Sequence, residues 1–271
     1  MRFLAYSKKN SDLIIIGVPY ESEVVFKKGA SIAPKKIREG SEAIEYYSPY
    51  QNKIAKNFYD EGDMEIKNLK KKEIFKKIKE KIKNILKDDK KFILIGGDHT
   101  ITYPAVLAIK EFFKEFILIH IDAHLDRRKI FKKDEINYAT VIKRIEEKIG
   151  EENVFTFGVR AKGKEEKITK NIYFFNVYEN IKKIENILKT KKFYVSIDLD
   201  VLDPAFFPAV TNPEPGGIDF KEILNTIIFL SNFKENIIGF DVVEYNPLVS
   251  QEMTWAISAS IIIREIICSL I

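Results

Sequence analysis

The stretch that most constrains the fold is residues 117–126, ILIHIDAHLD. Its first half is apolar and is typical of a buried strand in a parallel sheet. It leads directly into Asp122, His124 and Asp126, spaced i, i+2 and i+4. In extended backbone alternate side chains share one face, so these three groups are expected to converge. Without a positive charge between them they would repel and desolvate one another, so the spacing predicts a divalent cation at the end of this strand.

Two further apolar stretches end in the same kind of residue. One leads into Asp198 and Asp200, and the other leads through two glycines into Asp98 and His99. Strand ends of an open parallel sheet lie side by side, and ligands bind outside their carboxyl ends. Asp98 is expected to cap a helix or hold a loop. The remaining four aspartates and two histidines are more than one metal ion needs, whereas two ions bridged by shared carboxylates would use them all.

Strand patterns alternate with helical patterns, which predicts βαβ units, a parallel sheet and helices on both faces. The expected strands are residues 12–18, 92–95, 116–122, 154–157, 172–175, 193–199 and 237–242. The expected helices are residues 34–45, 71–86, 101–113, 139–147, 177–188, 220–230 and 254–270, the last being a buried core helix or partly a subunit contact. Neither a linker nor a repeat is evident, so a single domain over residues 1–271 is expected.

Composition narrows the function classes. Hydrophobic residues make up 45% of the chain and charged residues 31%, which is typical of a soluble globular protein. Acidic residues are interleaved with the lysines and no binding motif occurs, which argues against a nucleic-acid partner. The longest apolar runs are too short to cross a bilayer, a signal-peptide pattern is missing and Cys268 stands alone, so a cytoplasmic protein without a membrane partner is expected. The dominance of Lys, Glu and Ile suggests a thermophile.

With these motifs the chain resembles the ureohydrolase family, which includes arginases and agmatinases. The matching segments are residues 96–99 (GGDH), 122–126 (DAHLD), 196–204 (SIDLDVLDP), 213–217 (PEPGG) and 240–247 (FDVVEYNP), with weaker similarity at 17–20 and 28–30. One segment alone is weak, but the set in this order is specific and covers nearly the whole chain. The resemblance implies a three-layer α/β fold of the arginase–deacetylase type, with a parallel sheet between helices.

The resemblance also implies a dinuclear manganese centre. One ion would be held by His99, Asp122, Asp126 and Asp198, and the other by His124, Asp122, Asp198 and Asp200, so that Asp122 and Asp198 bridge the two ions. Carboxylate oxygens with one imidazole per ion suit two Mn²⁺ per chain better than a thiolate-preferring metal. His120 lies within the strand and is expected to be a satisfied buried polar group instead.

The activity implied by the resemblance is hydrolysis of a guanidino compound, with agmatine as the first expectation. The products would be urea and putrescine, a step of polyamine biosynthesis. Two cations would provide a nucleophilic water near neutral pH. Asp126 would take a proton from it and pass the proton to the leaving amine, and Glu244 would hold the guanidinium by charge-assisted hydrogen bonds.

One position departs from the family pattern. Many ureohydrolases carry a histidine, read as a proton shuttle, where this chain has Tyr138. Tyrosine titrates near pH ~10 and is a poor shuttle at neutrality. The change predicts slower activity, a need for higher pH, or another substrate.

Charges near the expected substrate mouth favour different substrates. A basic run there would repel the cationic tail of agmatine and suit an acidic tail such as that of guanidinobutyrate, unless its side chains point outward. The run comprises Arg127, Arg128, Lys129, Lys132 and Lys133. Glu214, in the PEPGG segment, favours the agmatinase branch.

Several alternatives stay open on the sequence alone. The substrate could be aminopropyl-agmatine, guanidinobutyrate or arginine in place of agmatine. The change at Tyr138 also allows a catalytically weakened, metal-binding assembly subunit. Relatives form trimers and hexamers, so the resemblance implies a homo-oligomer.

Overall fold

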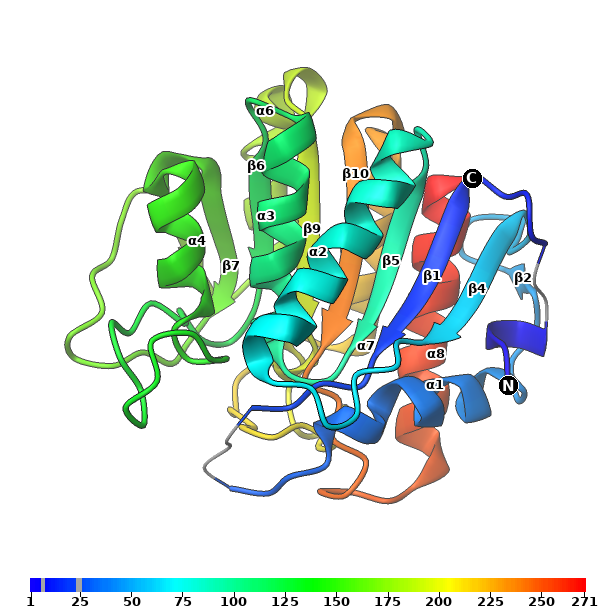
Figure 1. The fold of residues 1–271 in the computed structure, drawn as a ribbon, viewed down its shortest axis with the longest axis horizontal. Helices are drawn as coiled ribbons and strands as arrows, with labels where there is room; N and C mark the ends of the chain where they lie inside the picture. The colour runs from blue at the N-terminus through cyan, green and yellow to red at the C-terminus, as the bar shows by residue number, and fades with distance from the viewer. Residues whose placement is uncertain (6–7, 23–25) are drawn as a thin grey trace.

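The computed structural model describes residues 1–5, 8–22 and 26–271. Its centre is an eight-stranded sheet in the order β4-β1-β5-β10-β9-β6-β7-β8, in which all pairings are parallel (Figure 1). The strands are β1 (Leu13–Val18), β4 (Phe58–Asp63), β5 (Lys91–Gly96), β6 (Ile117–Ile121), β7 (Val154–Val159), β8 (Ile172–Phe174), β9 (Phe193–Asp198) and β10 (Ile237–Val243). Two short strands, β2 (Tyr47–Ser48) and β3 (Lys53–Ile54), form a separate antiparallel hairpin.

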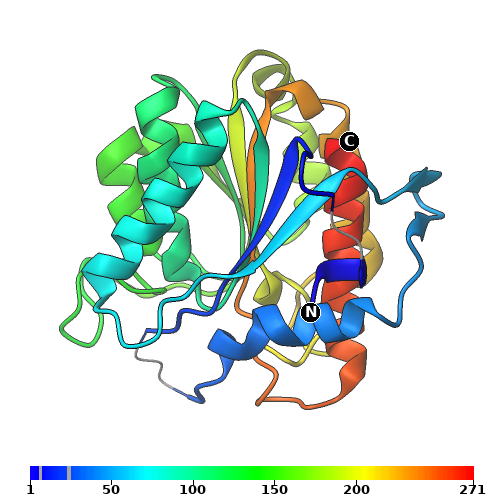
Figure 2. The same cartoon turned by 45° about the vertical axis from the view of Figure 1, so that its right-hand side comes forward.

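Helices cover both faces of the sheet, which gives three layers (Figure 2). One face carries α2 (Lys71–Lys87), α3 (Thr102–Phe112) and α4 (Val141–Ile149). The other carries α1 (Ala33–Ser41), α5 (Val177–Lys182), α6 (Glu185–Thr190), α7 (Phe220–Ser231) and α8 (Met253–Leu270). The predicted fold class is therefore confirmed.

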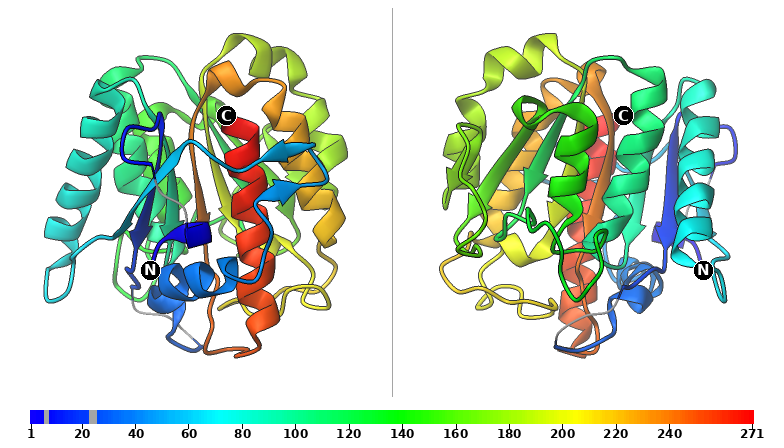
Figure 3. Two further views of the ribbon diagram at one scale, coloured as in Figure 1. Left: turned by 90° about the vertical axis from the view of Figure 1, so that its right-hand side faces the viewer. Right: turned by 60° about the vertical axis from the view of Figure 1, so that its left-hand side comes forward.

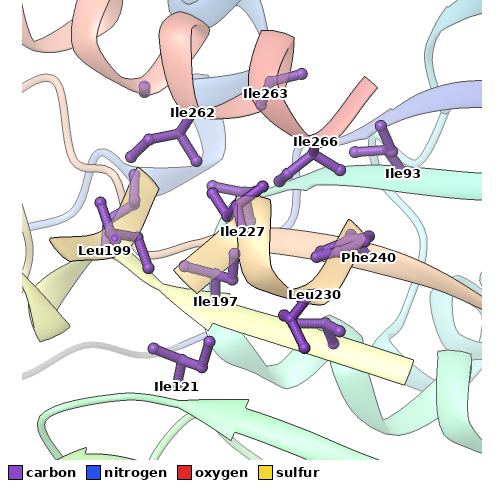
Figure 4. Close-up of a cluster of buried hydrophobic side chains, with 14 of the residues drawn as sticks. Ile93, Ile121, Ile197, Leu199, Ile227, Leu230, Phe240, Ile262, Ile263 and Ile266 are labelled. Carbon is purple, nitrogen blue, oxygen red and sulfur yellow. The ribbon is translucent and has the colours of Figure 1, made fainter. Parts of the chain in front are cut away.

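Two cores form because alternate residues of each buried strand face opposite layers. In β5, Ile93 and Ile95 belong to the core beneath α7 and α8, whereas Phe92 and Leu94 belong to the core beneath α2 and α3. Figure 4 shows part of the first core, where strand side chains meet Ile227 and neighbouring apolar residues of α7 and α8. Parallel strands buried on both faces need such continuous apolar runs, which explains the strength of the strand signals.

The last helix, α8, is long and apolar enough to cross a membrane by length and composition, but 67% of this segment is buried within the protein. It packs against α1 and α7, and the β2–β3 hairpin lies beside it (Figure 3). The prediction of a core helix at residues 254–270 is confirmed for most of its surface.

The sequence patterns missed the edge strand β4 and the β2–β3 hairpin. The sequence of β4, FYDEGD, is too polar to be recognised as a buried strand. The helix expected at 34–45 ends at Ser41, before the hairpin. The helix expected at 177–188 is divided, because Ile184 leaves helical geometry at φ −102° and ψ 15°.

The polar strand β4 is held to α1 by a buried ion pair. Arg38 donates from Nε and Nη2 to the two carboxylate oxygens of Asp60, at 2.7 and 2.8 Å. Asp60 is fully buried and also accepts from the backbone of Phe3 and Gly62. These interactions hold the pKa of Asp60 below its usual range despite burial. The pair satisfies a charge that would otherwise stand alone in the core.

Removing one partner of this pair should destabilise the protein. Arg38→Met leaves Asp60 buried without its counter-charge, which typically costs about 3–5 kcal/mol. Replacing both residues, in Arg38→Met/Asp60→Leu, should recover most of that loss. Urea unfolding measures these changes, with the exposed Lys35→Met on the same helix as the control. An Arg38→Met variant as stable as Lys35→Met would contradict the prediction.

Candidate metal centre and active site

The predicted site residues meet at the carboxyl ends of four adjacent central strands. β5, β10, β9 and β6 are neighbours in the sheet, and their ends deliver His99, Glu244, Asp198 and Asp122 respectively. In Figure 1 these are the arrowhead ends of the strands, where the connecting loops gather. The expectation that the three motifs lie close together at one edge of the sheet is therefore confirmed.

Around His99, four possible ligand atoms face one another. Its Nδ1 lies 3.1 Å from Asp122 Oδ2, 3.3 Å from Asp126 Oδ2 and 3.2 Å from Asp198 Oδ2. The ring is fully buried, and Nδ1 makes no hydrogen bond of acceptable geometry within the described part of the chain. A bare nitrogen among three carboxylate oxygens has the donor set of a cation site.

A second group of ligand atoms adjoins the first. His124 Nδ1 lies 2.8 Å from Asp200 Oδ2 and 3.5 Å from Asp122 Oδ1. The two oxygens of Asp122 thus face different histidines, as a bridging carboxylate requires. Asp198 turns Oδ2 toward His99, while its Oδ1 accepts a hydrogen bond from the backbone N–H of Asp200.

The charges of these groups fit a pair of divalent cations. Burial, together with the charges of Asp200 and Asp122, raises the pKa of Asp198 well above its usual range. Burial and the charge of Asp122 raise the pKa of Asp126 to about 7. Burial also raises the pKa of Glu244 well above normal, with the charge of Asp98 adding to the effect. Against the effect of burial, the neighbouring histidines hold the pKa of Asp122 well below its usual range. They do not offset the raised pKa of Asp198, Asp126 and Glu244, which cations between the carboxylates would lower.

Unusual backbone positions aim these side chains. Asp126 and Glu244 both adopt left-handed geometry, with φ of 51° and 66°. Such positions cost on the order of 1–3 kcal/mol for non-glycine residues and cluster at functional sites. Before His99, a Cβ on Gly97 would lie 1.9 Å from the carbonyl oxygen of Tyr20, so only glycine fits there.

This cluster is held in place by His120 and Asp98, for which a structural role was expected. His120 Nε2 lies 2.8 Å from Asp122 Oδ2, and its Nδ1 lies 3.2 Å from Thr156 Oγ1. Burial lowers the pKa of His120 to about 4, so its ring is neutral at neutral pH. Asp98 accepts from the backbone N–H of Thr100 and from Ser22, and so holds two loops together. The expectation that Asp98 holds a loop is confirmed, and His120 is buried and hydrogen-bonded as expected.

A cavity of about 290 Å³ opens onto the cluster. Its lining includes His124, Asp126, Arg128, Phe131, Tyr138, Lys162, Glu166, Asp198, Asp200, Asn212, Glu214 and Glu244. Tyr138 is buried, and its ring stands at 75° to that of Phe131, with the ring centroids 5.8 Å apart. Asn137 fixes this loop, because its amide donates to two backbone carbonyls and its oxygen accepts from Ala139.

Most of the basic run lies away from the cavity. Only Arg128 of the five residues is among the lining residues. Arg127 is buried and pairs with Glu146 at 2.8 Å. Lys129 is exposed and lies outside the lining. Most of the basic run therefore lies outside the cavity, which agrees with the outward orientation allowed by the sequence analysis. Glu214, in contrast, lines the cavity.

Arg160 was missed by sequence reasoning. Its guanidinium donates to the backbone carbonyls of Asp200 at 2.7 Å, Val201 at 3.1 Å and Glu214 at 2.8 Å. A Cβ on Gly217 would lie 2.6 Å from Arg160 Nη2, so the glycine leaves room for it. The partners are carbonyls, which carry no side-chain signature in a sequence, and only the fold brings them together.

Comparison with known proteins agrees with this geometry. A family model described as the arginase family matches residues 11–268. The agmatinase of Bacillus cereus is 32% identical over 268 residues, covering 96% of this chain and 92% of that protein. A Clostridium difficile structure has a TM-score of 0.88 at 32% identity, covering 96% of this chain and 97% of that one. The agmatine ureohydrolase of Thermoplasma volcanium has a TM-score of 0.86 at 25% identity, covering 99% and 94%. The chain therefore belongs to the arginase family and is a hydrolase of the ureohydrolase type.

Proposed function

We propose that this protein hydrolyses agmatine to urea and putrescine at a two-manganese site. The observation that carries the proposal is a cavity whose lining joins members of two His/Asp groups, Asp126 of one and His124 and Asp200 of the other. Glu244 and Glu214 line the same cavity. The similarity to agmatinases supports the same substrate class.

The described side chains supply a donor set for two ions. His99, Asp122, Asp126 and Asp198 would hold one, and His124, Asp122, Asp198 and Asp200 the other. Hard oxygen ligands with one imidazole per site suit Mn²⁺. Such a pair, when bound, supplies Lewis acidity for attack of water on the guanidinium carbon.

Glu244 is proposed to hold the substrate guanidinium. Its Oε1 accepts a hydrogen bond from the backbone N–H of His99 at 2.8 Å, which fixes the carboxylate at the cavity wall. A planar guanidinium and a carboxylate can form two parallel hydrogen bonds, which sets orientation as well as affinity. The arriving positive charge favours the ionised form of Glu244 against the effect of burial.

Asp126 is proposed to move the proton. It lines the cavity beside the other ligand carboxylates, and its left-handed backbone is held by bonds from the N–H groups of Ile142 and Lys143 to its carbonyl oxygen. A carboxylate in this position can accept a proton from the attacking water and deliver it to the departing amine, provided the two lie within hydrogen-bond reach.

The tail of the substrate is proposed to be cationic. The carboxylate of Glu214 lines the cavity, and its Oε1 lies 3.6 Å from His124 Nε2. Among the lining carboxylates other than the proposed metal ligands and Glu244, Glu166 is engaged by the backbone N–H groups of Arg127 and Gly163. Glu214 is thus the carboxylate best placed to meet an ammonium group.

A urea-release assay with Mn²⁺ tests the substrate. Agmatine should be preferred over guanidinobutyrate and arginine, and chelation should abolish activity until Mn²⁺ is restored. Glu214→Gln should weaken the preference for agmatine by up to about fivefold in KM, because a partly exposed charge pair contributes at most ~1 kcal/mol. Glu179→Gln, whose side chain is 65% exposed and lies outside the cavity lining, is the control. Metal-loaded protein that is inert on all these guanidines would refute the proposal.

Glu244→Gln should lower kcat/KM while leaving the fold and the manganese content unchanged. Loss of a charge-assisted contact costs roughly 1.5–3 kcal/mol, which corresponds to about ten- to hundred-fold. Steady-state kinetics and elemental analysis provide the measurements. Glu244→Asp keeps the charge at a shorter reach and should fall between wild type and the glutamine variant. Unchanged kinetics in Glu244→Gln would remove this residue from the site.

Tyr138→His tests the departure from the family pattern. If the proton path to the leaving amine is impaired, imidazole with its pKa near ~6.5 should raise the rate near neutral pH. The gain should stay well below the ~10²–10⁴-fold of a well-placed acid–base group, because the surrounding loop is built for tyrosine. Tyr138→Phe is the matched control and should have little effect. A loss of rate in both variants would show that tyrosine has a role of its own.

The second candidate function is a metal-binding subunit with weakened catalysis. It is favoured by Tyr138, which lines the cavity where a shuttle histidine would be expected. Protein that binds Mn²⁺ but releases no urea from any guanidine would support this function over the first.

A further inference from the structure

A row of buried polar side chains crosses the middle of the sheet beneath the proposed metal centre. Thr156, His120, Ser196 and Asp241 are paired in register across β7, β6, β9 and β10. All four are fully buried. Polar groups here interrupt strands that are otherwise apolar, and such groups are costly to bury unless they are hydrogen-bonded.

Asp241 is the acceptor on which this row ends. Its Oδ2 accepts from Tyr194 at 2.7 Å and from Thr102 at 2.9 Å, and its Oδ1 accepts from Ser196 at 2.6 Å. Burial and the charge of Asp241 raise the pKa of Tyr194 well above normal, so the phenol keeps its proton and donates. A carboxylate surrounded by three hydroxyl groups serves as acceptor for each of them.

The direction of these bonds determines the role of Ser196. A hydroxyl group has one hydrogen, and Ser196 uses it toward Asp241. His99 Nε2 lies 2.8 Å from the same oxygen. Because the serine oxygen can then only accept, the proton of a neutral His99 ring resides on Nε2. Its Nδ1, which faces Asp122, Asp126 and Asp198, is left with a free lone pair.

We propose that Asp241 is a positioning residue for cation binding, which acts through Ser196 to hold the proton of His99 on Nε2. The proposal rests on the proposed function, in which His99 is a ligand. A second partner that fixes the tautomer and orientation of a metal-binding histidine is commonly worth ten- to hundred-fold in metal affinity. Asp241 lies within β10, whereas His99 begins the turn after β5, and Ser196 connects the two by its contacts with Asp241 and with His99.

The proposed relay runs from Asp241 through Ser196 to His99. Calorimetry of Mn²⁺ binding to the metal-free full chain tests it. Ser196→Ala and Asp241→Asn should each weaken binding of one of the two ions by about ten- to hundred-fold. Since Asp241 acts through Ser196, the double variant should bind no more weakly than Ser196→Ala alone. Tyr194→Phe removes a hydroxyl from the same carboxylate but leaves the Ser196–His99 contact, and should bind both ions like wild type.

The possible outcomes separate the relay from the site itself. Losses that add in the double variant, or an unchanged affinity in Ser196→Ala, would overturn the relay. His99→Ala that binds both ions like wild type would overturn the ligand assignment and the relay with it. Circular dichroism checks the fold of each variant. If Ser196→Ala does not fold, Ser196→Cys, which keeps the size but has only a weak donor, takes its place in the same cycle.

Discussion

The structure depends on the crowding of negative charge at the carboxyl ends of the central strands. Asp122, Asp198 and Asp200 are nearly or fully buried and lie within reach of the same two histidines. Burial and mutual repulsion favour the neutral form of such groups, and they raise the pKa of Asp198 and Asp200 above the usual range. The site thus gains its charge balance when cations bind. Around it, the sheet and its two helical layers serve to keep mutually repelling groups in place.

The need to keep these carboxylates in place explains several features that are unfavourable for the stability of the fold. Asp126 and Glu244 tolerate left-handed backbone, and polar side chains replace apolar ones in the interior of the sheet. Each is held by a specific partner: the backbone of Asp126 by two N–H groups, Glu244 by the N–H of His99, and Asp122 by His120. Local instability is concentrated at the site and is offset by the surrounding apolar cores.

Much of this could be predicted from sequence because the relevant signals are local. The strand-then-aspartate pattern at 117–126 fixes both a buried strand and the side on which Asp122 and His124 emerge, and parallel strands place such ends together. β4 could not be predicted, because its burial depends on Arg38, a partner that is 22 residues away from Asp60. The same holds for Asp241 and Arg160, whose roles arise from contacts between strands and loops. Predicting that most of the basic run points away from the cavity would also have required knowledge of the loop geometry.

The way in which Arg160 is bound affects which substitutions such a site can accept during evolution. Its hydrogen bonds go to carbonyl groups of residues 200–202 and 214 and do not depend on the side chains there. Substitutions on the cavity-facing side of these loops therefore leave the anchor intact. The strand end that carries Asp200 stays in place while the neighbouring wall acquires new chemistry. Selection can thus alter the shape and charge of the cavity wall without first rebuilding the proposed metal site, and the same separation gives protein engineers a defined set of positions to vary.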